Sequence, residues 1–158
     1  MVRQAAGTRL TLRWILASLH LLGFGIGLAA IWMRARAFRG TLDRDGLRRL
    51  FYADNFWGLS FIILLVTGLW RLLGGVEKGT DYYLSYPVFH TKMGLLVLIL
   101  GLEIWPMVTL IRWRVALGKG QAVDTARAAT FARISTAQGW LLALMVLAAT
   151  AMARGIGL

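Results

Sequence analysis

The 158-residue chain contains no cysteine, only two prolines and two histidines, and only seven acidic residues. Without cysteine, the protein forms no disulfide, holds no iron–sulfur cluster and uses no thiolate as a ligand or nucleophile. It also lacks a glycine-rich phosphate-binding loop, a nucleophile elbow and a His-Glu-x-x-His motif. None of its patterns therefore defines a known class of enzymatic reaction.

What the chain does contain is apolar sequence, at 58% hydrophobic residues and a mean hydropathy of +0.65. Four apolar segments cover residues 12–33, 55–73, 87–111 and 132–153, and each is close to the roughly 20 residues needed to cross a bilayer as a helix. Backbone groups in lipid must pair within the segment, so these segments are expected to be helical. The sequence predicts an all-α, polytopic membrane protein, with one four-helix transmembrane bundle over residues 1–158 and the lipid bilayer as its surroundings.

The formal net charge is +11, which in a water-soluble protein would suggest nucleic-acid binding. Here the Lys and Arg residues cluster at the ends of the apolar segments, so we expect lipid contact and no nucleic-acid partner. Eleven of the 18 Lys and Arg residues follow the first and third segments. The positive-inside rule therefore predicts a multi-pass protein with the connections after these two segments in the cytoplasm and both termini on the outer, periplasmic side.

The segments themselves carry three further local signals. The first is longer than the core of a cleaved signal peptide, so we expect it to be retained. Asp43–Phe51 has leucines on one face and arginines on the other, which predicts a short interfacial helix that runs into the second span. Gly23 and Gly27 form a Gly-x-x-x-Gly pair, which favours a packing face inside the monomer, with a dimer seam as the alternative.

The two histidines and a nearby lysine are candidates for binding a cofactor. His20 lies in the first span and His90 near the start of the third, so both are expected in the outer half of the bundle. Imidazoles from two helices can hold a metal or haem iron, which makes both residues candidate metal ligands. Alternatively, they only hydrogen-bond neighbouring helices. Lys92 either binds an anionic group or extends to the outer interface.

Glu103 and Gln138 are buried polar residues at similar predicted depths in the third and fourth spans. A hydrogen bond between them would offset part of the cost of burial. If no cation lies close to Glu103, its carboxyl group is a candidate for proton transfer. The alternative is a structural contact between helices.

Several segments of the chain resemble a domain-of-unknown-function family of predicted four-helix bacterial inner-membrane proteins. The resemblance is carried by Arg48–Asp54, Thr67–Arg71, Tyr83–Met93, Ile111–Arg114 and Ala151–Gly157. It implies the same four-helix membrane fold over most of the chain, but no established activity.

Leu19-His20 and the segment Phe89–Lys92 are also similar to the HemJ-type protoporphyrinogen oxidases. In those proteins a first-span histidine and a His-x-Lys sequence at the third span are associated with haem b. The resemblance implies haem b binding through His20, His90 and Lys92. This chain lacks the asparagine of that family's Arg-x-x-Asn pattern before the last span, so haem binding is implied more directly than oxidase activity.

Three functions are compatible with the sequence. The protein binds haem b and handles electrons or porphyrin, or it is a non-catalytic accessory subunit of a larger respiratory or photosynthetic membrane complex. A small permease or sensor is the third alternative. A homo-oligomer is compatible with each of them.

Overall fold

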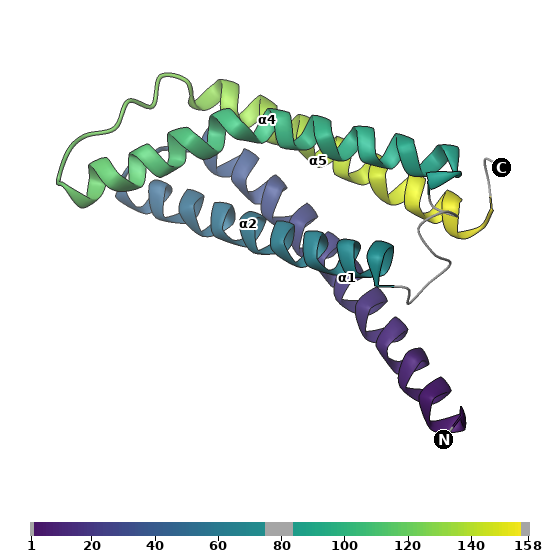
Figure 1. Ribbon diagram of the computed structural model, residues 1–158. Helices are drawn as coiled ribbons and strands as arrows, with labels where there is room; N and C mark the ends of the chain where they lie inside the picture. The colour runs from purple at the N-terminus through teal and green to yellow at the C-terminus, as the bar shows by residue number, and fades with distance from the viewer. Residues whose placement is uncertain (1, 75–83, 156–158) are drawn as a thin grey trace.

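The described part of the protein consists of long helices that lie side by side and are connected at alternate ends (Figure 1). The computed structural model describes residues 2–74 and 84–155. It contains α1 (Val2–Arg39), α2 (Arg44–Leu73), α4 (Pro87–Gly118) and α5 (Ala128–Ala153) (Figure 1). All four are long and apolar enough to cross a membrane, which confirms the predicted all-α four-helix membrane fold. Residues 83 and 156–157, which belong to two segments that carry the family resemblance, lie outside the described residues.

The helices are longer than the predicted apolar segments because their polar ends continue beyond the hydrophobic stretch. α1 extends to Arg39 and α4 to Gly118, beyond the predicted segment ends at residues 33 and 111. α4 begins at Pro87, a residue whose fixed φ and missing N–H suit the first turn of a helix.

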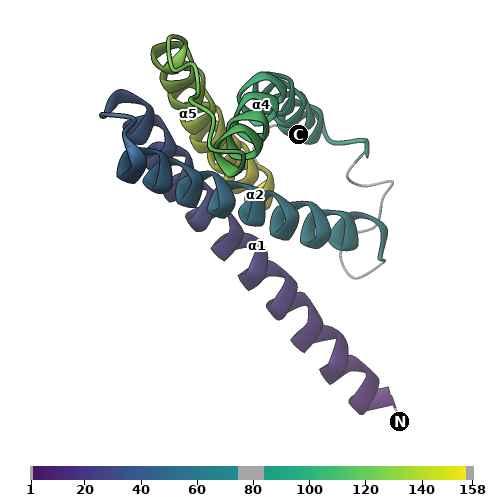
Figure 2. The ribbon, with the colours of Figure 1, turned by 90° about the vertical axis from the view of Figure 1, so that its left-hand side faces the viewer.

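The helices pack in the spatial order α2, α1, α5, α4. Extensive contacts join α1 to α2, α1 to α5 and α4 to α5. Figures 1 and 2 show α1 beside α2, α4 beside α5, and the N-terminal turns of α1 extending away from the other helices. We call the end with the α1–α2 and α4–α5 connections the loop end, and the opposite end, where both chain termini lie, the terminal end.

The predicted interfacial helix is present as the first two turns of α2. Asp43 caps α2, its side chain accepting a hydrogen bond from the backbone N–H of Gly46 at 2.7 Å. Leu47 and Leu50 are buried, while the arginines of this segment are exposed. The amphipathic pattern is therefore confirmed, and the helix continues without a break into the second span.

Two apolar clusters form the core. The cluster near the loop end includes Phe38, Leu50 and Trp113, and the cluster nearer the middle includes Ile31, Trp57, Ile99 and Leu142 among others. Each helix contributes residues to both clusters. Between these residues, each helix carries a buried or half-buried polar side chain: Arg34, Asp54, Glu103 and Gln138 in chain order. A layer of polar groups therefore separates two apolar layers.

Gly23 and Gly27 confirm the predicted packing face inside the monomer. A methyl group at Gly23 would touch Ile63 and Leu64 of α2, and one at Gly27 would collide with the hydroxyl group of Ser60. The Ser60 hydroxyl also donates a hydrogen bond to the carbonyl oxygen of Gly23 at 3.0 Å. Small residues thus let α1 and α2 approach closely, as expected for helices in lipid.

Candidate functional site

Arg34 is the centre of the polar layer. It lies on the buried face of α1, where Phe24, Gly27, Ile31, Arg34 and Phe38 follow one another at steps of three and four residues. That spacing places one stripe of side chains against the neighbouring helices. The Arg34 side chain is 0% exposed, so its charge must be compensated inside the bundle.

The guanidinium group of Arg34 contacts the other three helices at once. Its Nε donates to Ser135 of α5 at 3.2 Å, and Nη1 donates to Asp54 of α2 at 3.0 Å and to Glu103 of α4 at 2.7 Å. Nη2 donates to the second oxygen of Glu103 at 2.6 Å and to Gln138 of α5 at 2.9 Å. A guanidinium group has five N–H donors, and each of them has an acceptor here.

The acceptors of Arg34 are themselves held in place. Gln138 donates to Glu103 Oε2 at 2.8 Å and to the backbone carbonyl of Ile99 at 3.1 Å. Asp54 accepts a second hydrogen bond, from Arg114 of α4 at 2.9 Å. Arg114 thereby links α4 to α2, two helices that are not neighbours in the packing order.

The polar layer contains two arginines and two carboxylates, so its formal charge is balanced. In the described part of the chain, no buried side-chain nitrogen or oxygen is left without a hydrogen-bond partner. A closed, neutral network of this kind positions the helices relative to one another. The arrangement suits a structural role, since it leaves no donor of Arg34 for a ligand.

The structure contains the predicted Glu103–Gln138 hydrogen bond, but it does not meet the condition for proton transfer by Glu103. That hypothesis required a carboxyl group without a nearby cation. Arg34 instead donates to both carboxylate oxygens of Glu103, at 2.7 and 2.6 Å, so a cation lies in direct contact with this carboxyl group.

A second polar site lies at the terminal end, in a cavity of about 500 Å³ between all four helices. Its lining includes His20 of α1, Arg71 of α2, and Phe89 and Lys92 of α4. Among the described residues that line it, none is acidic. The cavity therefore combines apolar walls with three basic side chains.

His20 is fixed by a hydrogen bond to the neighbouring helix. Its Nδ1 lies 2.7 Å from Thr67 Oγ1, and the Thr67 hydroxyl group donates its single proton to the carbonyl of Ile63 at 2.6 Å. When the Thr67 hydroxyl donates to Ile63, it accepts from His20, and the proton of the neutral ring is then on Nδ1. In the neutral ring, Nε2 carries the lone pair. The edge of the imidazole also packs against Phe24, with ring centroids 5.2 Å apart.

The structure brings His20 and Lys92 to the same cavity, but not His90. His90 is exposed, and its Nε2 donates to the backbone carbonyl of Leu84 at 2.7 Å. His90 therefore holds the start of α4 against the segment before it. In the described part of the chain, no group of three or more metal-binding side chains is present.

Sequence reasoning missed the centre of the polar layer. By sequence, Arg34 is one of the positive charges that follow the first span, and no local pattern marks Asp54, Arg114 or Ser135 as buried polar residues. The signal was present for Arg34, because its position continues the apolar three-and-four spacing of α1. The partners of Arg34 are 20 to 104 positions away, so no local pattern reveals them.

These features define an α-helical membrane protein with an internal ionic layer and a basic cavity near one face. The chain belongs to the family described as Predicted membrane protein (DUF2214), whose model matches residues 12–157. No curated protein and no solved structure matches the chain.

Proposed function

We propose that this protein binds haem b in the cavity at the terminal end, with His20 as the iron ligand. The observation that carries the proposal is the position of His20 in the wall of a basic cavity of about 500 Å³. That volume lies within the range typical of small-molecule and cofactor sites. When bound, haem would supply one-electron or porphyrin chemistry within the membrane.

The lining of the cavity fits the two chemical parts of a haem. The aromatic rings of Phe24 and Phe89 provide apolar walls for a flat macrocycle. Arg71 and Lys92 provide positive charge for its two carboxylates. Arginine and lysine are the side chains that bind carboxylates most strongly.

The orientation of His20 also supports the proposal. Metal-binding histidines commonly donate their second ring N–H to a fixed acceptor, which sets the tautomer and the direction of the ring. Thr67 Oγ1 lies 2.7 Å from Nδ1 of His20, and a histidine that donates from Nδ1 to such an acceptor binds a metal through Nε2. The similarity to HemJ-type proteins at Leu19-His20 and Phe89–Lys92 supports the same cofactor.

An absorption spectrum of the protein, purified after expression with added haem precursor, tests this proposal. We expect a Soret band that is lost in His20→Ala and retained in His90→Ala. The second variant is the matched control, because it removes a histidine of the same chain that does not line the cavity. Titration of the colourless protein with haem measures the affinity of each variant.

Two results would contradict haem binding. The first is a folded wild-type protein that neither carries a Soret band nor takes up added haem. The second is equal haem affinity in the wild type and His20→Ala. If the colourless protein instead co-purifies with a stoichiometric membrane complex after mild solubilisation, the accessory-subunit alternative is favoured.

We also propose that the loop end faces the cytoplasm of a bacterial inner membrane, because most Lys and Arg residues lie at this end. The absence of native cysteine makes a direct test simple. Gln121→Cys lies in the α4–α5 connection and Arg154→Cys follows α5. In intact cells, a membrane-impermeant maleimide should label only Arg154→Cys. Labelling of Gln121→Cys alone would reverse the orientation.

A further inference from the structure

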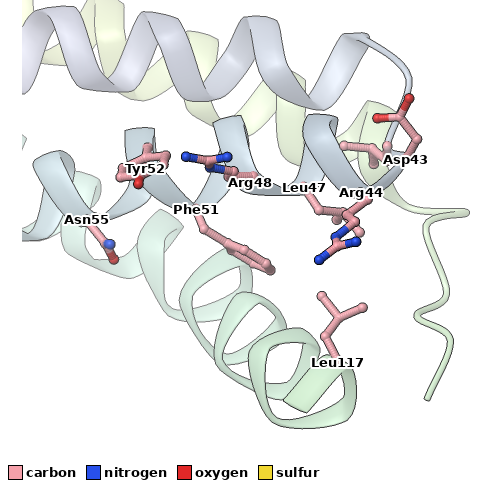
Figure 3. Close-up of a pocket in the computed structure, with 9 residues that line it drawn as sticks. Asp43, Arg44, Leu47, Arg48, Phe51, Tyr52, Asn55 and Leu117 are labelled. Carbon is pink, nitrogen blue, oxygen red and sulfur yellow. The ribbon is translucent and has the colours of Figure 1, made fainter. Parts of the chain in front are cut away.

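A second recess lies at the loop end, outside the polar layer and at the opposite end of the bundle from His20 and Lys92. It is an open groove of about 710 Å³ between the first turns of α2 and the end of α4. Figure 3 shows Arg44, Leu47 and Phe51 extending from α2 toward the side on which Leu117 of α4 lies. The guanidinium group of Arg48 lies beside Tyr52, 5.7 Å from the centre of its ring. The groove is thus basic at one end and apolar deeper in.

The basic side of the groove consists of two arginines that are one helical turn apart. Arg44 and Arg48 are both exposed and are separated by four positions, so their side chains lie on the same face of α2. In the described part of the chain, no acid forms an ion pair with either of them. The one acid in the lining, Asp43, accepts the capping hydrogen bond of α2.

The apolar side of the groove is formed by Phe51 and Leu117. Phe51 packs against the core cluster of the loop end, and the guanidinium group of Arg114 stacks on its ring at 4.6 Å. Leu117 is exposed in the last turn of α4. An apolar chain placed between Phe51 and Leu117 would cover surface that would otherwise contact bulk lipid or water.

We propose that this groove binds one anionic phospholipid, with its phosphate between Arg44 and Arg48 and an acyl chain along Phe51 and Leu117. The groove lies at the beginning of α2, one of the four helices long and apolar enough to cross a membrane. Basic pockets between transmembrane helices are suited to anionic headgroups. Charge complementarity and the apolar depth of the groove together select a lipid over a soluble anion.

Lipid binding to delipidated protein in detergent, followed by native mass spectrometry, tests the assignment. We expect the wild type to prefer phosphatidylglycerol over phosphatidylcholine with the same acyl chains. Arg44→Gln/Arg48→Gln should weaken phosphatidylglycerol binding by about thirtyfold, from the usual contribution of two basic residues at an anionic surface. Phosphatidylcholine binding should not change.

The matched control is Arg36→Gln/Arg49→Gln. It removes two exposed arginines from the same end of the protein but leaves the groove lining unchanged, so we expect less than a threefold effect. Leu117→Asn tests the apolar side and should weaken binding of both lipids. Arg44→Lys/Arg48→Lys keeps the charge and should retain most of the phosphatidylglycerol preference.

The assignment is overturned if the wild type does not distinguish the two lipids, or if both double glutamine variants weaken binding equally. It is also overturned if inorganic phosphate displaces phosphatidylglycerol at millimolar concentration, because the site would then be selective for a free anion. None of these outcomes depends on haem binding, which involves residues at the opposite end of the bundle.

Discussion

Replacing Glu103 with leucine removes the main counter-charge of Arg34. In Glu103→Leu, the guanidinium group loses two of its five acceptors, and Gln138 loses one of the two acceptors of its amide group. Asp54 remains, but it is shared with Arg114. The polar layer is then left with two cations and one carboxylate.

The expected loss of stability follows from these contacts. Three hydrogen bonds between helices, at about 0.6 to 1.7 kcal/mol each in a membrane protein, give about 2 to 5 kcal/mol. Removing one partner of a buried ion pair typically costs about 3 to 5 kcal/mol, because the remaining charge is uncompensated. We therefore expect Glu103→Leu to lower the free energy of unfolding by about 3 to 5 kcal/mol.

A double-mutant cycle separates the interaction energy between Arg34 and Glu103 from other effects of replacing each residue with leucine. Arg34→Leu should cost at least as much as Glu103→Leu, because it removes all five hydrogen bonds of the guanidinium group. The double variant restores charge balance, since Asp54 and Arg114 remain paired. Its cost should resemble that of one single variant, which gives a coupling energy of about 3 kcal/mol or more.

Unfolding of the purified protein in mixed micelles or bicelles gives these energies, with Arg36→Leu as the exposed control on the same helix. The control should change stability by less than about 0.5 kcal/mol. If the two single costs simply add in the double variant, the layer does not act as a coupled network. A cost below about 1 kcal/mol for Glu103→Leu would mean that its charge is not desolvated as the structure indicates.

Three further perturbations test separate parts of the structure. Gly27→Val should destabilise the α1–α2 contact by about 1 to 3 kcal/mol through overpacking. Gly25 has open space around it, so Gly25→Val should be tolerated. Equal effects of the two substitutions in unfolding assays would contradict this contact. Gln138→Leu should cost less than Glu103→Leu in the same assay, because it removes no charge. Thr67→Val should preserve the Soret band but shift the reduction potential of bound haem, since it removes the hydrogen bond that orients His20; an unchanged potential would show that this bond does not tune the site.

The helices could be predicted from the sequence because each one carries its own signal. Apolar segments of about 20 residues cross a bilayer only as helices, and this rule needs no knowledge of neighbouring helices. The amphipathic start of α2 and the Gly23–Gly27 face were predictable for the same reason. Their periodicity specifies which side of a helix is buried. The extension of α1 to Arg39 was not predicted, because polar residues at a helix end do not show whether the helix stops.

The contacts of the site could be predicted only in part. The Glu103–Gln138 pair follows from comparing depths in two spans. The role of Arg34 does not, because an arginine close to a span end normally reaches the interface. Only its place in the buried stripe of α1 distinguishes it, and its acceptors come from three other helices. The separation of His20 from His90 likewise depends on how the helices pack.

In this protein, burial of an ionisable group and an excess of uncompensated charge select different residues as functional candidates. Intramembrane ionisable groups are usually taken as functional candidates because their burial is costly, and that rule selects Glu103 and Arg34. In the structure, these two residues neutralise each other, and every donor of Arg34 has an acceptor. The two recesses show the opposite pattern, since basic side chains exceed acidic ones in the lining of both. The deeply buried layer holds the four helices in register, whereas the recesses at the two ends of the bundle carry the basic side chains that we propose for ligand recognition.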